Sequence, residues 1–380
     1  MKTKLIYIVL ILGMVTLDGC RKVLDFNDDE IKPLLVVNCF VTPDSIVTVD
    51  LTSSHSTLYK SNFFDPVKNA TIIMSCENEE FSDFSYVSEP DTVLYYDINT
   101  GQQLTKIYDA GSYQSKTATV SSNKTYRVTI DADGFESVSA ETRVPPSIPV
   151  ETIDTFTTVQ TDQYTKTYTK NAKIHFTDPG SDINYYQLKM EVAAINVYID
   201  PVMGTPTATP YYYSGYIDSD DPVFSTEDNN DIFGGSYNRF SIFDDKLFNG
   251  KKYGLSFTID ATYEPLETDS GYYYNYEEYS LKLYRIKLIS LSESMFNYLK
   301  TVTLQQTSEG DPFSDPVLVY TNIDNGTGIF GAFTSSSRII SYNNLPEELQ
   351  PFIPDMSDEE LFNYIRHQYK VLYISNTNAN

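Results

Sequence analysis

Short segments in which every second residue is apolar recur along this chain, separated by turn residues. The first covers residues 35–41, and the same period of two returns over 47–51 and 126–130. A period of two places alternate side chains on opposite faces of a strand, so each segment is expected to bury one face in a sheet. Many short strands with turn residues between them predict a mostly β fold built from sandwiches.

A proline cluster at 145–149 divides the chain, because proline cannot continue a central strand. We therefore expect an immunoglobulin-like or transthyretin-like β-sandwich over residues 34–146 and a second β-sandwich-like domain over 150–343. The second domain is expected to be irregular over 200–235.

Two sequences of the capping-box type predict helices in the C-terminal half. Ser290-x-x-Glu293 predicts one packed helix within the second domain, and Ser357-x-x-Glu360 predicts a short amphipathic helix in the tail, residues 344–380. A final strand is expected near 370–374. We therefore expect the tail to form an extension that contains a helix and a strand.

The N-terminal residues have the layout of an export signal. Two lysines precede the apolar run Leu5–Leu17, which is shorter than the about 20 residues that span a bilayer. Leu17-Asp18-Gly19-Cys20 resembles a lipobox, with Asp18 as the one departure. We interpret 1–19 as a lipoprotein signal peptide and Cys20 as the lipidated first residue of the mature chain. Two or three acyl chains anchor a protein stably where one does not.

Residues 20–33 are expected to form a flexible acidic tether. Arg21 stands where an inner-membrane retention signal would have Asp, and an acidic cluster follows at 25–30. This cluster resembles the acidic export signal of Bacteroidetes surface lipoproteins. We therefore expect an outer-membrane, lipid-anchored protein exposed at the cell surface.

The formal net charge of −25 limits the classes of partner. Nucleic-acid binding needs clustered lysine and arginine at the phosphates, so we exclude it as a function. Cys39 and Cys76 both alternate with apolar residues and are expected to point inward. In an oxidising compartment they either pair as a disulfide or remain two buried thiols, and both alternatives stay open.

Tyrosine clusters are the strongest candidates for contact with a ligand or a partner. The first comprises Tyr211, Tyr212, Tyr213 and Tyr216, and the second comprises Tyr272, Tyr273, Tyr274 and Tyr276. Consecutive tyrosines on a strand face both sides, so some are expected to be exposed. Tyrosine offers a rigid apolar face and a polar tip for protein or glycan contact. The alternative is cross-strand packing at a sheet surface.

Weaker patterns suggest two further kinds of site. One is a calcium site, because carboxylate oxygens are the ligands that calcium prefers. The acidic residues that could supply them are Asp218, Asp220, Asp221, Asp228 and Asp231. Their order does not match an EF-hand, and the alternative is a solvated loop. Ser45 and Thr92 lie in short matches to a Bacteroidetes O-glycosylation motif, both at expected turns.

Catalytic motifs are missing, and we expect no enzyme. The three histidines, His55, His175 and His367, are far apart and show no metal-binding spacing. Gly326-Thr-Gly328-Ile-Phe-Gly331 matches a dinucleotide fingerprint, but that fingerprint works only between a strand and a helix. Here a strand is expected to follow, so we interpret the glycines as a turn with positive φ and expect no cofactor.

Several motifs together resemble one protein family. They are Leu35-Val-Val-Asn38, Val41-Thr-Pro-Asp-Ser45, Val138-Ser-Ala-Glu141-Thr-x-Val-Pro145, Asp178-Pro179 with Asn184-Tyr-Tyr186, Leu299 with Asp311-Pro-Phe-Ser-Asp-Pro-Val317, and Asn322-Ile-x-Asn325-Gly326-x-Gly328-Ile-Phe-Gly331. As a set they resemble the Bacteroidetes lipoprotein family called domain of unknown function 4249, up to about residue 343. Cys39, where glycine is expected, and the tail depart from it.

The resemblance implies a function that the residues do not show by themselves. Members look like surface partners of TonB-dependent outer-membrane transporters. We therefore expect a non-catalytic accessory lipoprotein that helps such a transporter capture a nutrient or ligand. The alternative is a free-standing glycan- or peptide-binding lipoprotein.

Mass spectrometry of the mature protein tests the lipobox interpretation. We expect cleavage before Cys20 and acyl chains on that residue, because the preceding segment has the layout of a lipoprotein signal. A mature chain that begins at another residue would contradict the prediction.

Overall fold

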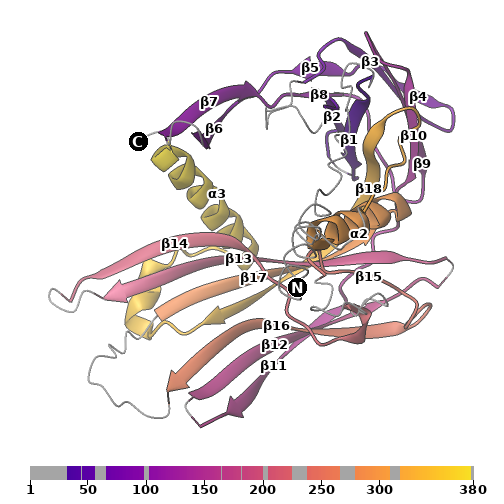
Figure 1. Ribbon diagram of the computed structural model, residues 1–380. Helices are drawn as coiled ribbons and strands as arrows, with labels where there is room; N and C mark the ends of the chain where they lie inside the picture. Colours follow the sequence, from indigo (N-terminus) through magenta and orange to yellow (C-terminus); the bar gives the residue numbers. More distant parts are fainter. Residues whose placement is uncertain are drawn as a thin grey trace, which may run out of the picture.

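In the residues that it describes, the computed structural model contains two β-sandwiches and two long helices (Figure 1). It describes residues 32–43, 45–55, 66–97, 102–163, 165–180, 182–199, 204–224, 238–265, 279–308 and 317–377. The predicted mostly β, sandwich-rich fold is confirmed. The signal peptide, Cys20 and most of the tether lie outside the described residues.

The first sandwich encloses one hydrophobic core. One layer contains β1 (Leu35–Val41), β2 (Thr48–Ser53), β8 (Ser112–Gln114) and β5 (Ser85–Val87). The facing layer contains β10 (Val138–Arg143), β9 (Thr125–Ala132), β3 (Ala70–Cys76) and β4 (Glu79–Phe81). Val37, Ile72 and Ile130 are among the buried side chains between them. Alternate residues of β1 are buried, as the period of two predicts.

The second sandwich follows the proline cluster. One layer contains β14 (Pro206–Gly215), β13 (Tyr185–Ile199), β17 (Tyr279–Leu291) and β18 (Thr327–Asn343), with the short β15 (Ile242–Asp244) against β13. The other layer contains β11 (Thr152–Thr161), β12 (Thr165–Thr177) and β16 (Lys252–Pro265). Aromatic side chains, including Phe176, Tyr186 and Phe248, fill the core between the layers. Two short 3₁₀ turns, η2 (Pro222–Phe224) and η3 (Glu347–Phe352), lie in connections.

Strand β18 belongs to both sandwiches. Residues 327–332 pair in parallel with residues 36–41 of β1, and residues 333–343 pair antiparallel with β17. One continuous sheet therefore runs through both sandwiches. Phe330 and Ala332 of this strand complete the first core, although they lie far along the chain from its other members.

The start of β18 requires glycine. Gly328 has φ of 102°, and a Cβ at this position would overlap with the carbonyl oxygen of Val37. Only glycine adopts such a backbone while allowing the neighbouring strand so close. The glycine pattern predicted a turn with positive φ. Of its three glycines, Gly328 has positive φ but lies within the strand, and the turn before it has positive φ at Asn325.

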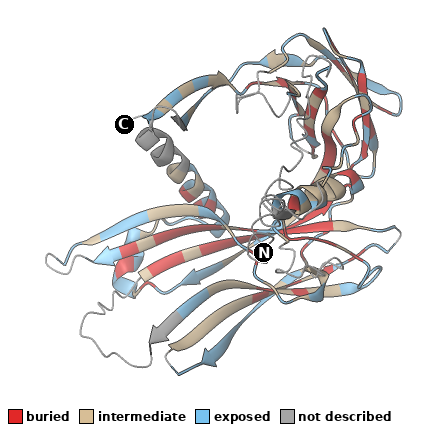
Figure 2. Ribbon diagram, viewed as in Figure 1, coloured by how far each residue is buried: buried red, intermediate tan, exposed pale blue. Residues whose placement is uncertain are grey.

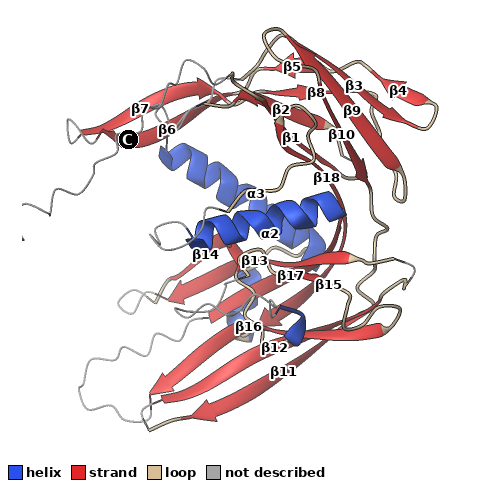
Figure 3. Cartoon of the chain, turned by 45° about the vertical axis from the view of Figure 1, so that its right-hand side comes forward, coloured by secondary structure: helices blue, strands red, loops and turns tan. Residues whose placement is uncertain are grey.

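Helices α2 (Glu293–Ser308) and α3 (Asp358–Thr377) cover the outer face of the second sandwich (Figure 3). α2 packs on an apolar cluster that includes Leu291, and α3 packs on one that includes Leu283. These two leucines lie an even number of residues apart on β17, so both clusters are on the same face. In the described chain, neither helix has the length and apolarity that crossing a bilayer requires.

The two predicted helix starts have different outcomes. The capping box at Ser357 is confirmed, because its hydroxyl and backbone N–H both donate to the Glu360 carboxylate, at 2.7 and 3.0 Å. The capping residue of α2 is Ser292, whose Oγ accepts the Met295 N–H, and not Ser290, which remains in β17. The prediction of a strand at 370–374 was wrong, because these residues belong to α3. No glycine or proline interrupts the helix that starts after Ser357, and it continues to Thr377.

Other strand predictions also need correction. Residues 200–235 are not irregular throughout, since β14 lies within them. Its prolines, Pro206 and Pro210, are tolerated because β14 is an edge strand. Residues 317–323, before β18, are not part of a strand.

A projecting hairpin and the cysteines complete the description. β6 (Pro90–Asp97) and β7 (Gln102–Asp109) form a separate two-stranded sheet, so Thr92 lies in a strand and not at the turn we predicted. Cys39 and Cys76 are buried and free. The structure therefore has the second of the two alternatives for these cysteines, and burial raises the pKa of the Cys39 thiol far above its usual value.

Replacing Gly328 by alanine tests the junction. We expect Gly328→Ala to lower the free energy of unfolding by about 3 kcal/mol or more, because strain at positive φ adds to overlap with Val37. Gly134 also has positive φ (89°), but a Cβ at that position would meet no atom within 4 Å. Gly134→Ala should therefore lower the free energy of unfolding by about 1–2 kcal/mol only. Urea unfolding of both variants gives the comparison, and equal losses would contradict the close approach.

Candidate functional site

A tyrosine-rich group of side chains lies at the end of the second sandwich where its hydrophobic core stops. We call this group the tyrosine end, and its members are Tyr211, Tyr213, Tyr284, Tyr342, Lys170, Lys282 and Asp260. Toward this end, buried positions give way to half-buried and exposed ones along β12 and β16, and β14 has only half-buried and exposed positions (Figure 2). The tyrosine end therefore combines aromatic rings with charged groups at an accessible edge of the core.

A β-bulge directs Asp260 into the space between the layers. The register of β12 against β16 shifts between Lys170 and Asn171, which leaves Ile259 as an extra residue in β16. Ile259 packs on the core, and the next residue, Asp260, also points inward. Bulges are known for turning one side chain out of the regular alternation. Without the extra residue, strict alternation would direct Asp260 to solvent.

Asp260 is the acceptor at the centre of the tyrosine end. Its carboxylate accepts the hydroxyl of Tyr284 at 3.0 Å and Nζ of Lys282 at 3.1 Å. The side chains of Lys282 and Asp260 are each 21% exposed, so water reaches both partners of this ion pair. Burial and the neighbouring carboxylate raise the pKa of Tyr284 well above its usual value, which keeps this hydroxyl protonated as a donor.

The remaining tyrosines present ring faces. Tyr211 and Tyr213, two residues apart on β14, stack with centroids 6.1 Å apart and planes within 10°. Tyr213 is 46% exposed. The Lys170 ammonium lies 3.0 Å from the ring centroid of Tyr342, a cation–π contact between the two layers. Flat aromatic surfaces beside a half-buried ion pair suit the binding of a ligand that has an apolar face and polar groups around its edge.

The other predicted tyrosines are placed elsewhere. Tyr212 points to the opposite face of β14, where its hydroxyl donates to Glu191 at 2.9 Å and its ring meets Phe362 of α3 edge-on. Burial and Glu191 raise the pKa of Tyr212 to about 12. Tyr216 lies after β14 and is 56% exposed. Tyr272, Tyr273, Tyr274 and Tyr276 lie outside the described residues. Of the four predicted tyrosines that the structure describes, Tyr211 and Tyr213 lie in the tyrosine end.

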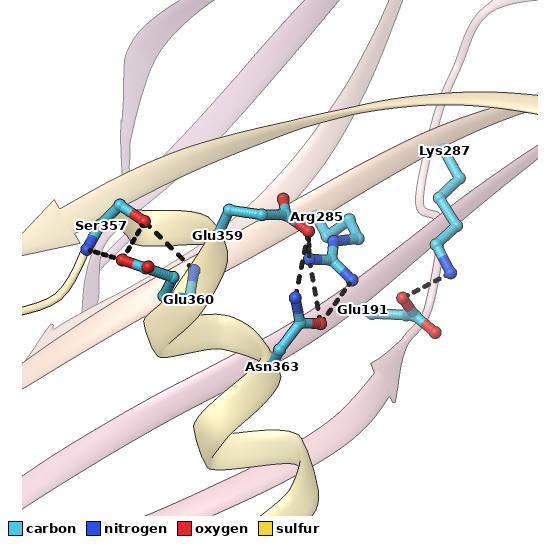
Figure 4. A network of polar contacts seen from close by, with 7 residues as sticks. All are labelled: Glu191, Arg285, Lys287, Ser357, Glu359, Glu360 and Asn363. Atoms are coloured by element: carbon cyan, nitrogen blue, oxygen red, sulfur yellow. Dashed lines mark hydrogen bonds and ion pairs between the residues drawn. The ribbon is translucent and has the colours of Figure 1, made fainter.

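A polar network attaches α3 to the outer face of the same sheet (Figure 4). The guanidinium of Arg285 is nearly buried, bonds to Glu359 and Asn363, and lies 3.9 Å from the ring centroid of Phe362. Next to it on the sheet, Lys287 pairs with Glu191 at 2.7 Å. Burial opposes ionisation of Glu191, but hydrogen bonds from Lys287 and Tyr212 together lower its pKa. Tyr212 therefore contributes to helix packing and not to an open surface.

The acidic residues proposed for calcium are only partly described. Asp221 accepts the hydroxyl of Tyr253 at 2.6 Å and the N–H of Val223 at 3.2 Å, so its carboxylate supports the η2 turn. Asp218 and Asp220 are exposed, whereas Asp228 and Asp231 lie outside the described residues. Across the part of the chain that the structure describes, no three acidic, histidine or cysteine side chains are placed to hold a metal ion. Calcium stays a prediction.

The histidines and the modification motifs occupy separate places. His175 Nε2 lies 2.9 Å from Asp154 Oδ2 on the neighbouring strand, which is a local hydrogen bond at the edge of the sheet. His55 and His367 are exposed, on the first sandwich and on α3. Ser45 and Thr92 are also exposed, so both are accessible, and their glycosylation stays a prediction.

Sequence reasoning missed all three charged members of the tyrosine end, although one signal was present. In β17, Lys282 shares its alternation with Tyr284 and Ile286, both of which are buried. A lysine on an apolar strand face needs an acceptor inside the fold. No comparable signal marked Asp260, because its inward orientation depends on the bulge.

Truncating Phe362 tests the attachment of α3. We expect Phe362→Ala to cost about 3–5 kcal/mol in local stability, because the ring is fully buried between Tyr212 and Arg285. Amide hydrogen exchange should speed up in α3 while both sandwich cores keep their protection. Tyr364→Ala, at a position 40% exposed on the same helix, is the matched control and should leave exchange unchanged. Equal effects of the two variants would refute this packing.

Comparison with known proteins assigns the chain to a family. No curated protein matches the sequence. A family model described as "Domain of unknown function (DUF4249)" matches residues 21–339, which include both sandwiches, α2 and most of β18. The motifs quoted for the resemblance have structural roles within this range: the Tyr186 hydroxyl donates to the buried Asp178, and Asn322 bonds to the backbone of Phe330. The chain belongs to the DUF4249 family.

Proposed function

We propose that this protein is a non-catalytic lipoprotein of the outer-membrane surface that captures a ligand at the tyrosine end and serves as an accessory partner of a TonB-dependent transporter. The observation that carries the binding role is the half-buried Lys282–Asp260 pair beside the stacked Tyr211 and Tyr213. The lipobox at Cys20 supports the anchor, and the family resemblance supports the transporter partnership.

The chemistry of the tyrosine end supports binding and not turnover. Tyr284, whose raised pKa keeps its hydroxyl protonated, and Lys282 are both donors already bound to Asp260. A ligand hydroxyl or amide that approaches this pair has both a cation and a carboxylate to bond with. Stacking on Tyr213 adds apolar contact with little loss of side-chain entropy, because tyrosine is stiff.

A free-standing glycan- or peptide-binding lipoprotein is the alternative. The exposed ring of Tyr213 suits this function equally well, because a ligand could stack on the ring without a transporter beside it. The two functions differ in whether the chain has a stable protein partner.

Extraction of the full-length chain from its native membrane in gentle detergents distinguishes the two. The accessory function predicts that it co-purifies with an outer-membrane β-barrel. A clean monomer across several detergents counts against that function and favours the free-standing binder.

Binding by the purified chain tests the tyrosine end under either function. Soluble glycans and peptides offered to the full-length chain in detergent should bind about tenfold or more weakly after joint Tyr211→Ala and Tyr213→Ala substitution, because both stacking faces are lost. Tyr364→Ala on α3 is the control and should bind like the unaltered protein. Undiminished binding by the double variant would exclude the tyrosine end as the site.

A further inference from the structure

The outer face of the second sandwich carries three polar residues in one row across the sheet, between the apolar clusters under α2 and α3. We call them the lysine row: Lys189 of β13 lies directly opposite Lys287 of β17, which lies directly opposite Ser337 of β18. Both strand pairs keep an unbroken register, so the three side chains share one face. That face is the one on which both helices pack.

The lysine row places two positive charges side by side. Like charges directly opposite each other on neighbouring strands destabilise a sheet. Partial desolvation by its neighbours and the adjacent Lys287 both lower the pKa of Lys189, although its side chain remains exposed, and Glu191 is the carboxylate that opposes them. Glu191, however, already forms an ion pair with Lys287 at 2.7 Å and accepts a hydrogen bond from Tyr212 (Figure 4). Lys189 has no ion pair among the described residues.

Other cations surround this position. Arg285 lies in the next row, beside Glu191, and is occupied by Glu359. Arg366 of α3 also acts on Glu191, since its charge contributes to the lowered pKa of that group. Among the described residues whose charges are assigned to this face, four cationic side chains share two carboxylates, Glu191 and Glu359, in a chain whose net charge is −25. A local excess of positive charge is unexpected in such an acidic protein unless an anion balances it.

The row is accessible. Lys189 and Ser337 are exposed, and Lys287 retains 25% of its side-chain exposure. Ser335, two residues before Ser337 on the same face, is exposed as well. The strands lie about 5 Å apart, and the long lysine side chains can bend from neighbouring strands toward one oxyanion.

We propose that the lysine row is a binding site for an oxyanion group, namely the phosphate, sulfate or carboxylate of a soluble ligand, with Lys189 and Lys287 as charged donors and Ser337 as a hydroxyl donor. Binding neutralises the opposed lysines and replaces their repulsion by two charge-assisted hydrogen bonds. The site is on the opposite face of the sheet from the tyrosine end and does not depend on ligand capture there.

Thermal unfolding and calorimetry of the full-length chain in detergent test this site with inorganic phosphate, sulfate and glucuronate at matched ionic strength. An anion that binds only the folded state raises its unfolding temperature. We expect at least one of the three to raise it and to bind by calorimetry, and Lys189→Gln to weaken that affinity about tenfold or more. Without any anion, Lys189→Gln should be as stable as the unaltered protein or more stable, because the repulsion is removed.

Controls separate a site from general salt effects, since phosphate and sulfate also stabilise proteins by exclusion from their surface. Lys116→Gln changes an exposed lysine of the first sandwich and should keep the full response to the anion. Ser337→Ala should show an intermediate loss of affinity. An equal response of Lys189→Gln and the unaltered protein, or no binding of any of the three anions, overturns the proposal.

Discussion

The pairing of β18 with β1 on one part and with β17 on the other is the interaction on which the rest of the structure depends. This strand contributes side chains to all four apolar clusters: Phe330 and Ala332 to the first core, Ile340 to the second, Ile339 to the cluster under α3, and Phe333 to the cluster under α2. The absence of a side chain at Gly328 allows this arrangement, because the strand must pass the backbone of Val37 closely.

The two faces of β17 have different surroundings, and its polar residues follow that difference. Lys282 and Tyr284 point between the layers to Asp260, whereas Arg285 and Lys287 point to the side on which the helices pack. On each face the charged groups lie where an apolar cluster ends. Burying such groups is costly unless each finds a partner, so these contacts also determine where α3 and the bulged strand β16 lie.

Local patterns predicted local structure well. Alternation identified residues 35–41 as a strand, and the capping box at Ser357 identified the start of α3. The predictions that failed concerned features that depend on contacts between residues distant in sequence. Prolines in β14 suggested an irregular loop, because nothing local shows that the strand lies at an edge of the sheet. Tyr211 and Tyr213 were recognised as candidate contacts, but Asp260 and Lys282 join them only through a bulge and the packing of two layers, which alternation within one strand does not encode.

The parallel partner of β1 also has consequences for folding kinetics. β1 is among the first described residues and its partner among the last, so this contact must close a very long loop, which slows folding. Until then, the backbone groups along one edge of β1 are unpaired, and an unpaired edge readily joins the wrong strand. The first sandwich therefore cannot complete its sheet until β18 has been made, and the edge of β1 is open to mispairing until then.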